Sequence, residues 1–175
     1  MSDELDRLAM ERVVSGDRSA WRELWDRWHR PVFAFLLKRT GSRQAAEEAH
    51  SEMWLKVWRY RKSYDGQRPF RSWLFRIAVN AGHDASRAEA SMWSMDPDDL
   101  AAIPAASGKN PVVLRDLLSR ALHELAPIDR RILLLTLEGF DSAEIGGLLE
   151  MNSTTVRVRL HRAREQLRGS LQEAR

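Results

Sequence analysis

Hydrophobic residues recur at intervals of three and four along most of this chain, which is the spacing of one face of an α-helix. Before residue 90 this pattern predicts four helices, at about 5–14, 18–40, 42–62 and 70–88. Gly16 and Asp17 supply a stop and a new helix cap, and Pro69 suits the first turn of the fourth helix. Pro31 lies inside the second helix, where a proline can kink it.

The pattern stops at about residue 91 and returns at about 112, after a segment rich in Pro, Gly, Ala and Asp. Beyond it, the spacing and capping residues predict four more helices, at about 113–122, 127–138, 142–149 and 153–171. We therefore predict an all-α fold: two small four-helix domains, 1–90 and 112–175, joined by a flexible linker at 91–111. A long ordered loop within one domain is the alternative.

Three of the predicted helices carry a clear apolar stripe that we expect to face a core. The third helix has Ala46, Ala49, Met53, Val57 and Tyr60 on its stripe, the fourth has Trp73, Leu74, Ile77 and Ala78, and the last has Val156, Leu160, Ala163, Leu167 and Leu171.

Composition indicates a folded protein, with 43% hydrophobic and 30% charged residues. The absence of Cys excludes disulfides, thiolate catalysis and Cys-based zinc sites. The five His are scattered, and no phosphate-binding Gly loop or nucleophile elbow is present, so we expect no enzyme activity, metal or cofactor. No apolar run approaches the roughly 18 residues that span a bilayer. We therefore expect a cytoplasmic protein without membrane insertion.

The segment 141–164 follows the helix-turn-helix plan: a short capped helix, a tight break and a long basic helix. Arg157, Val158, His161 and Arg162 are expected to face the major groove, where they could contact base edges. Side chains and backbone N–H groups at the start of the helix suit phosphates. These phosphate candidates are Ser153, Thr154 and Thr155, with Arg130, Arg131, Arg159 and Arg164 as further ones. The alternative is a solvated Arg-rich face that pairs with Glu165.

A second candidate site combines basic and aromatic residues, a combination that suits single-stranded nucleic acid. The basic residues are Arg59, Arg61, Lys62, Arg68, Arg71 and Arg76, and the interleaved aromatic residues are Trp58, Tyr60, Tyr64, Phe70, Trp73 and Phe75. The alternative is that most of these rings belong to the core.

The chain resembles the extracytoplasmic-function (ECF) sigma factors, two-domain subunits of bacterial RNA polymerase. The segments 47–58 and 68–80 are similar to that family's region 2, and 125–130, Glu144-Ile145, Thr155-Val156-Arg157 and 161–164 are similar to its region 4. This resemblance implies promoter-specific transcription initiation with core RNA polymerase, which is held through its beta-prime clamp helices and beta flap. It also implies a free monomer and control by an anti-sigma factor.

The resemblance also implies roles for individual residues. Those implied to bind the clamp helices are Glu47, Glu48, Glu52 and Leu55. Those implied to bind the minus-10 element are Arg61, Lys62, Tyr64, Arg68, Arg71, Trp73 and Asn80. Within this set, the 61–68 loop and Asn80 are implied to capture a flipped base. Those implied to read the minus-35 element are Arg157, Val158, His161 and Arg162.

The chain departs from the family pattern at several positions. Ala45 stands for a usual acid, Gly146 for a usual alanine, and Glu150 and Thr154 for common glycines. Separately from these departures, two other interpretations stay open. One is a stand-alone repressor or activator, which predicts a stable homodimer on palindromic sites, and the other is a sigma-like decoy that binds an anti-sigma factor without contacting DNA.

Overall fold

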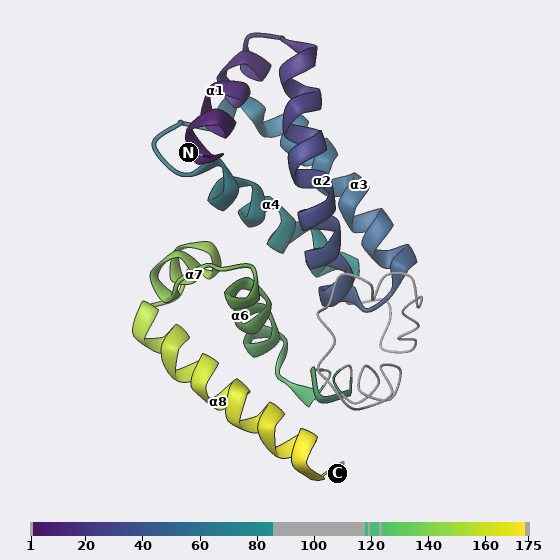
Figure 1. The fold of residues 1–175 in the computed structure, drawn as a ribbon, viewed down its shortest axis with the longest axis vertical. Helices are drawn as coiled ribbons and strands as arrows, with labels where there is room; N and C mark the ends of the chain where they lie inside the picture. The colour runs from purple at the N-terminus through teal and green to yellow at the C-terminus, as the bar shows by residue number, and fades with distance from the viewer. Residues whose placement is uncertain (1, 86–117, 119, 123, 174–175) are drawn as a thin grey trace. The chain divides into compact units, whose positions relative to one another are not determined.

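The computed structural model describes residues 2–85, 118, 120–122 and 124–173, and the elements in these residues are all helices (Figure 1). The elements are α1 (Ser2–Val14), α2 (Arg18–Thr40), α3 (Arg43–Tyr60), the short 3₁₀ helix η1 (Arg61–Ser63), α4 (Phe70–Ala85), α6 (Pro127–Leu137), α7 (Ser142–Leu149) and α8 (Ser153–Glu173). They form two compact units, the first with α1 to α4 and the second with α6 to α8. The predicted linker at 91–111 lies outside the described residues.

The first unit begins with two helices joined at Gly16 and Asp17. The Asp17 carboxylate accepts hydrogen bonds from the backbone N–H groups of Ser19 at 2.8 Å and Ala20 at 3.2 Å. These bonds satisfy donors that the start of α2 leaves free, so Asp17 is the helix cap that the sequence predicts. Figure 1 shows α2 and α3 side by side, and α1 and α4 also pack on α2.

The core of the first unit is rich in aromatic side chains. Phe35 and Phe75 are fully buried and meet edge to face, with ring centroids 5.2 Å apart. Trp28 lies against Phe75 and Phe70. A second group of rings joins α2 to α3, where Trp21 contacts Trp54 at 5.4 Å and Trp58 at 5.2 Å, and Trp25 contacts Trp54 at 4.8 Å.

Most of the predicted stripe on α3 is buried, namely Ala46, Ala49, Met53 and Val57. Tyr60 is an incorrect prediction, because it is the last residue of α3 and half of its surface is exposed.

On α4, Leu74 and Ala78 are buried as predicted, whereas Trp73 and Ile77 are only half-buried. Phe70 and Phe75 occupy the core instead, which confirms the core interpretation for these two rings alone among the six aromatics of the candidate site.

The core of the second unit is mainly aliphatic, with Phe140 as a buried ring. The apolar run of α6, Ile132 to Leu135, is buried at all four positions. The stripe of α8 is buried at Val156, Leu160 and Ala163 and half-buried at Leu167 and Leu171. Of the predicted helix at 113–122, residues 118 and 120–122 are described and helical, and the other residues of this helix lie outside the described residues.

Candidate nucleic-acid interface

Two local capping motifs build the helix-turn-helix. The Asp141 carboxylate accepts from the N–H groups of Ala143 at 2.7 Å and Glu144 at 2.8 Å, while the Glu144 carboxylate accepts from the Asp141 N–H at 2.8 Å. This reciprocal capping box begins α7 as predicted. The Asn152 side-chain oxygen then accepts from the Thr154 N–H at 2.8 Å and caps α8.

The turn between α7 and α8 folds back tightly on Gly146. The Met151 N–H donates to the Gly146 carbonyl at 2.8 Å, and a Cβ at position 146 would lie only 2.6 Å from the Met151 carbonyl oxygen. Glu150 adopts the left-handed conformation, with φ of 57°, at a position where glycine is usually favoured. Gly146 and Glu150, two positions at which the chain departs from the family pattern, thus belong to one tight turn.

The face of α8 that was predicted to read bases is exposed. Arg157, Val158, His161 and Arg162 all lie at the surface, and 45% of the Val158 surface is accessible. The Arg157 guanidinium donates a hydrogen bond of 3.2 Å to the Thr154 hydroxyl and therefore points toward the start of α8. Exposure of this face is what a groove-reading helix requires.

Two of the further phosphate candidates are bonded within the protein. Arg130 donates to the Leu122 carbonyl at 2.8 Å, and burial lowers the pKa of this guanidinium. Arg159 forms an ion pair of 2.9 Å with Asp129. These two guanidiniums therefore hold the helices together. Arg164 is exposed and Arg131 is half-buried.

In the first unit, the loop between α3 and α4 is held by its own aromatic and polar groups. The Tyr64 hydroxyl donates to the Arg68 carbonyl at 2.9 Å, and the Tyr64 ring contacts Phe70 and Trp73 at centroid distances of 5.8 and 5.6 Å. Burial, with a smaller contribution from the Asp3 carboxylate, raises the pKa of Tyr64 to about 12. The hydroxyl therefore stays protonated and able to donate at neutral pH.

The predicted minus-10 residues divide into supporting and exposed groups. Arg61 lies 4.1 Å above the Trp58 ring and donates to the Trp58 carbonyl at 2.7 Å, so it packs on the end of α3. Lys62 and Arg68 are exposed in the loop. Asn80 is exposed further along α4, about 15 Å from Phe70 at 1.5 Å per residue.

A stripe on α4 connects the loop with Asn80. Trp73, Arg76 and Asn80 are spaced by three and four residues and therefore lie on one side of the helix, and each is at least partly accessible. Arg71 is half-buried, with its guanidinium 5.9 Å from the Phe75 ring centroid. Arg76 belongs to the predicted basic cluster, and its spacing from Trp73 and Asn80 also makes it part of this stripe.

The third candidate surface is the exposed side of α3. Glu48, Glu52 and Leu55 are spaced by four and three residues, and Leu55 has 66% of its surface exposed. Glu47 is exposed beside them, and Glu52 pairs with Lys56 at 2.5 Å. Sequence reasoning missed Trp58 here: it lies one turn beyond Leu55 and is 41% exposed, so it extends the apolar part of this side.

Sequence comparisons match both halves of the chain to one family. Residues 24–91 match the model of Sigma-70 region 2, and residues 115–167 match that of Sigma-70, region 4. The sigma factor CarQ of Myxococcus xanthus is 33% identical, over 94% of this chain and 96% of the relative. The ECF sigma-E factor of Escherichia coli strain K12 is 32% identical, over 98% and 97%. This chain belongs to the ECF RNA polymerase sigma factors.

Two solved structures, one of them of a sigma factor, have the same fold. CnrH, in complex with the cytosolic domain of CnrY, superposes with a TM-score of 0.75 at 23% identity, covering 97% of this chain and 98% of that one. RpoE of Bartonella quintana, in complex with the anti-sigma factor NepR, superposes with a TM-score of 0.69 at 20% identity, covering 89% and 98%.

As a member of this non-enzymatic family, the sigma factor carries three exposed surfaces: the α8 face, the loop with α4, and the side of α3. Within the described residues, no group of three or more His, Cys, Asp and Glu side chains could hold a metal. No helix in that part of the chain is long and apolar enough to cross a membrane.

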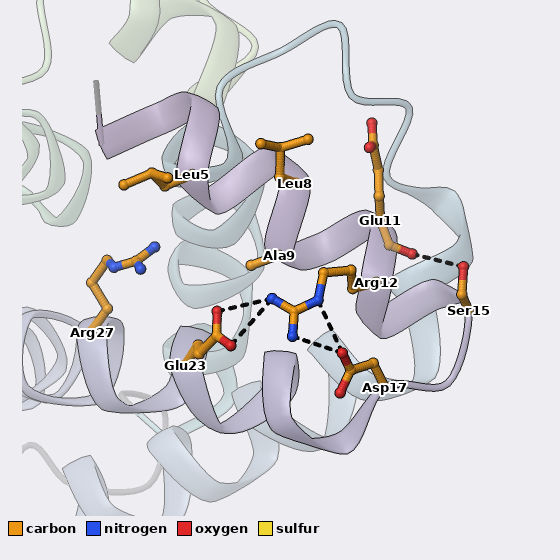
Figure 2. Close-up of a pocket in the computed structure, with 9 residues that line it drawn as sticks. All are labelled: Leu5, Leu8, Ala9, Glu11, Arg12, Ser15, Asp17, Glu23 and Arg27. Atoms are coloured by element: carbon orange, nitrogen blue, oxygen red, sulfur yellow. Dashed lines mark hydrogen bonds and ion pairs between the residues drawn. The ribbon is translucent and has the colours of Figure 1, made fainter.

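A hollow of about 550 Å³ between α1 and α2 belongs to none of these three surfaces. Figure 2 shows Arg12 in this hollow, between the carboxylates of Asp17 and Glu23, with ion-pair distances of 2.7 and 3.2 Å. Arg27, on the other wall, pairs with the buried carboxylate of Asp6. These ion pairs join α1 to α2, so we interpret the hollow as part of the packing interface between these two helices.

Proposed function

We propose that this sigma factor binds core RNA polymerase and directs initiation at specific promoters, with its first unit at the minus-10 element and its second at the minus-35 element. The observation that carries the proposal is the exposed, capped recognition helix α8, whose Arg157, Val158, His161 and Arg162 share one accessible face. A bidentate Arg–guanine contact on such a face discriminates bases by about 1–3 kcal/mol.

The surface on α3 would bind the polymerase. An exposed leucine beside Trp58, flanked by the carboxylates of Glu47, Glu48 and Glu52, combines an apolar anchor with a charged rim. We assign this surface to the beta-prime clamp helices, and we expect the second unit to contact the beta flap.

The loop and α4 would take the melted strand. Lys62 and Arg68 can follow phosphates, while the partly accessible Trp73 offers a stacking ring and Asn80 a base-edge contact. A strand of a few nucleotides would span the distance from the loop to Asn80. We therefore assign Arg61 and Tyr64 to support of the loop, and Lys62, Arg68, Arg71, Trp73 and Asn80 to contacts with DNA.

We also propose that an anti-sigma factor holds this chain inactive. The similar structure of RpoE contains the anti-sigma factor NepR, and CnrH is in complex with the cytosolic domain of CnrY. An anti-sigma factor that covers the exposed Leu55 and Trp58 would compete directly with the polymerase. The free chain would be a monomer.

Run-off transcription with purified core polymerase and a promoter pool tests this proposal. We expect Arg157→Ala to weaken promoter binding about tenfold, while Arg168→Ala, which changes an exposed arginine paired with Glu165, serves as the matched control. Leu55→Ala should weaken core binding about tenfold, against the exposed Leu5→Ala as control. Absence of transcription together with a stable homodimer would favour a repressor, and absence of transcription by a monomer that binds no DNA would favour a decoy.

A further inference from the structure

The N-terminal helix α1 contacts the loop that we assign to the minus-10 element. The Asp3 carboxylate accepts a hydrogen bond of 3.1 Å from the backbone N–H of Phe70, across 67 positions of the chain. The loop also approaches α1 at Gly66, where a Cβ would lie 3.8 Å from Arg7 Cγ and 3.8 Å from Glu11 Oε1. Helix α1 therefore supports both the loop and the helix that follows it.

Asp3, which lies in α1, acts as a cap for the start of α4. Phe70 is the first residue of α4, and the first N–H groups of a helix have no partner within that helix. The residue before it is Pro69, whose ring has no acceptor atom, so the usual side-chain cap is missing at this helix. The carboxylate of Asp3 takes that place and ties the first turn of α4 to α1.

Arg7 and Glu11 form the second support. The Arg7 guanidinium is held between the carboxylates of Glu4 and Glu11, each at 2.5 Å, so its aliphatic stem is fixed beside Gly66. Gly66 has a φ of +70°, which a glycine adopts without strain. Tyr64 then closes the loop through its bond to the Arg68 carbonyl.

We propose that α1 is a positioning element for base capture, in which Asp3 fixes the first turn of α4 and Arg7 with Glu11 supports the loop before DNA binds. A loop that is already ordered loses less conformational entropy on binding. Asp3 is thus a positioning residue that acts through Phe70 and the loop. This inference rests on the proposed function, because it concerns the strand that the loop would hold.

The test uses the full chain assembled with core polymerase. The probe is a single-stranded oligonucleotide with the minus-10 element of a promoter that the holoenzyme transcribes. Removing a cap by Asp3→Ala should weaken oligonucleotide binding about fivefold and leave core affinity unchanged. Asp3→Asn keeps an acceptor oxygen and should restore binding, since Asn caps as well as Asp. Asp26→Ala, which removes an exposed carboxylate of α2, is the matched control.

Three results would overturn the inference. The first is that Asp3→Ala binds the oligonucleotide as tightly as the unaltered chain does. The second is that Asp3→Ala loses as much affinity for core polymerase as for the oligonucleotide, and the third is that Asp3→Asn does not restore oligonucleotide binding. A failure of the unaltered chain to transcribe would count against the proposed function instead. In that case hydrogen exchange in the free chain still tests whether Asp3 supports the first turn of α4. Asp3→Ala should speed exchange of the Phe70 amide about fivefold, and an unchanged rate would disprove the support by Asp3.

Discussion

The two units of this sigma factor place their candidate DNA-binding residues by different means. In the second unit, a capping box and an Asn cap, each within four residues of the chain, set the start of α7 and α8. In the first unit, the loop and α4 depend on contacts between distant segments, such as that of Asp3 with Phe70. The interiors also differ: Phe35, Phe70 and Phe75 fill the first, whereas Ile132, Leu134 and Leu135 fill the second.

This difference shows that a sequence can indicate both the residues and the supports of a site built from local caps, whereas for a site that depends on distant contacts it indicates the residues but not their supports, such as Asp3. It also implies that core substitutions will affect the two sites differently. A change in the core of the first unit should disturb its loop, because Phe70 is both a core residue and a contact of Tyr64.

The largest expected effects come from core truncation, which tests whether the two units unfold separately. Phe70→Ala should destabilise the first unit by about 3–5 kcal/mol, and Leu134→Ala the second by about 2–5 kcal/mol. All tryptophans in the described residues lie in the first unit, so thermal unfolding followed by tryptophan fluorescence should shift for Phe70→Ala. Leu134→Ala should shift a transition seen by circular dichroism. An equal fluorescence shift for Leu134→Ala would show that the units unfold together.

A smaller effect is expected in the turn of the helix-turn-helix, where two adjacent glycines form a matched pair. Gly146→Ala forces a Cβ against the Met151 carbonyl and should destabilise the second unit by about 1–3 kcal/mol. Gly147→Ala has no atom within 4 Å of the new Cβ and should stabilise α7 by about 0.5–1 kcal/mol. Urea unfolding of both variants measures the difference. Equal effects would show that the turn does not depend on the close approach.

Glu150→Gly should relieve the left-handed strain of the same turn and raise stability by about 0.5 kcal/mol, because glycine accepts this conformation but gains freedom in the unfolded chain. It also removes a carboxylate next to the recognition helix and should strengthen promoter binding. Glu150→Ala removes the charge and keeps the strain. If Ala and Gly variants have the same unfolding midpoint, strain is absent at this position.

The smallest effect concerns pH and distinguishes the units again. The Trp54 indole N–H donates to His50 Nε2 at 2.9 Å, and burial lowers the pKa of His50, so the folded first unit disfavours protonation of this ring. The unfolded chain takes up the proton first as pH falls below about 6.5, so stability should decline below that pH. His50→Gln should flatten the decline in fluorescence-monitored unfolding, whereas His161→Gln, on the exposed face of α8, should leave it unchanged. A decline of the same slope in His50→Gln would assign it to other groups.

Much of the fold was predictable because its signals are local. The Asp17 cap, the Asp141–Glu144 capping box and the stripe of α8 each involve residues three or four positions apart. The exposure of Arg157 and His161 follows from the same periodicity, since the opposite side of α8 is apolar.

Other features depended on which segments meet. Arg130 and Arg159 are arginines of a basic region, but their partners, the Leu122 carbonyl and Asp129, are set by the packing of the second unit. Tyr60 continues the apolar period of α3 and yet is exposed, because the helix ends there.

By itself, the sequence determined an all-helical sigma factor, the bounds of its capped helices and the face of its recognition helix. These features follow from steric and hydrogen-bonding rules within one or two helical turns. The tertiary structure alone decided that Asp3 caps α4 and that α1 supports the loop. Burial of apolar surface brings helices together without specifying which polar groups will meet, so such contacts exist only once the chain has folded.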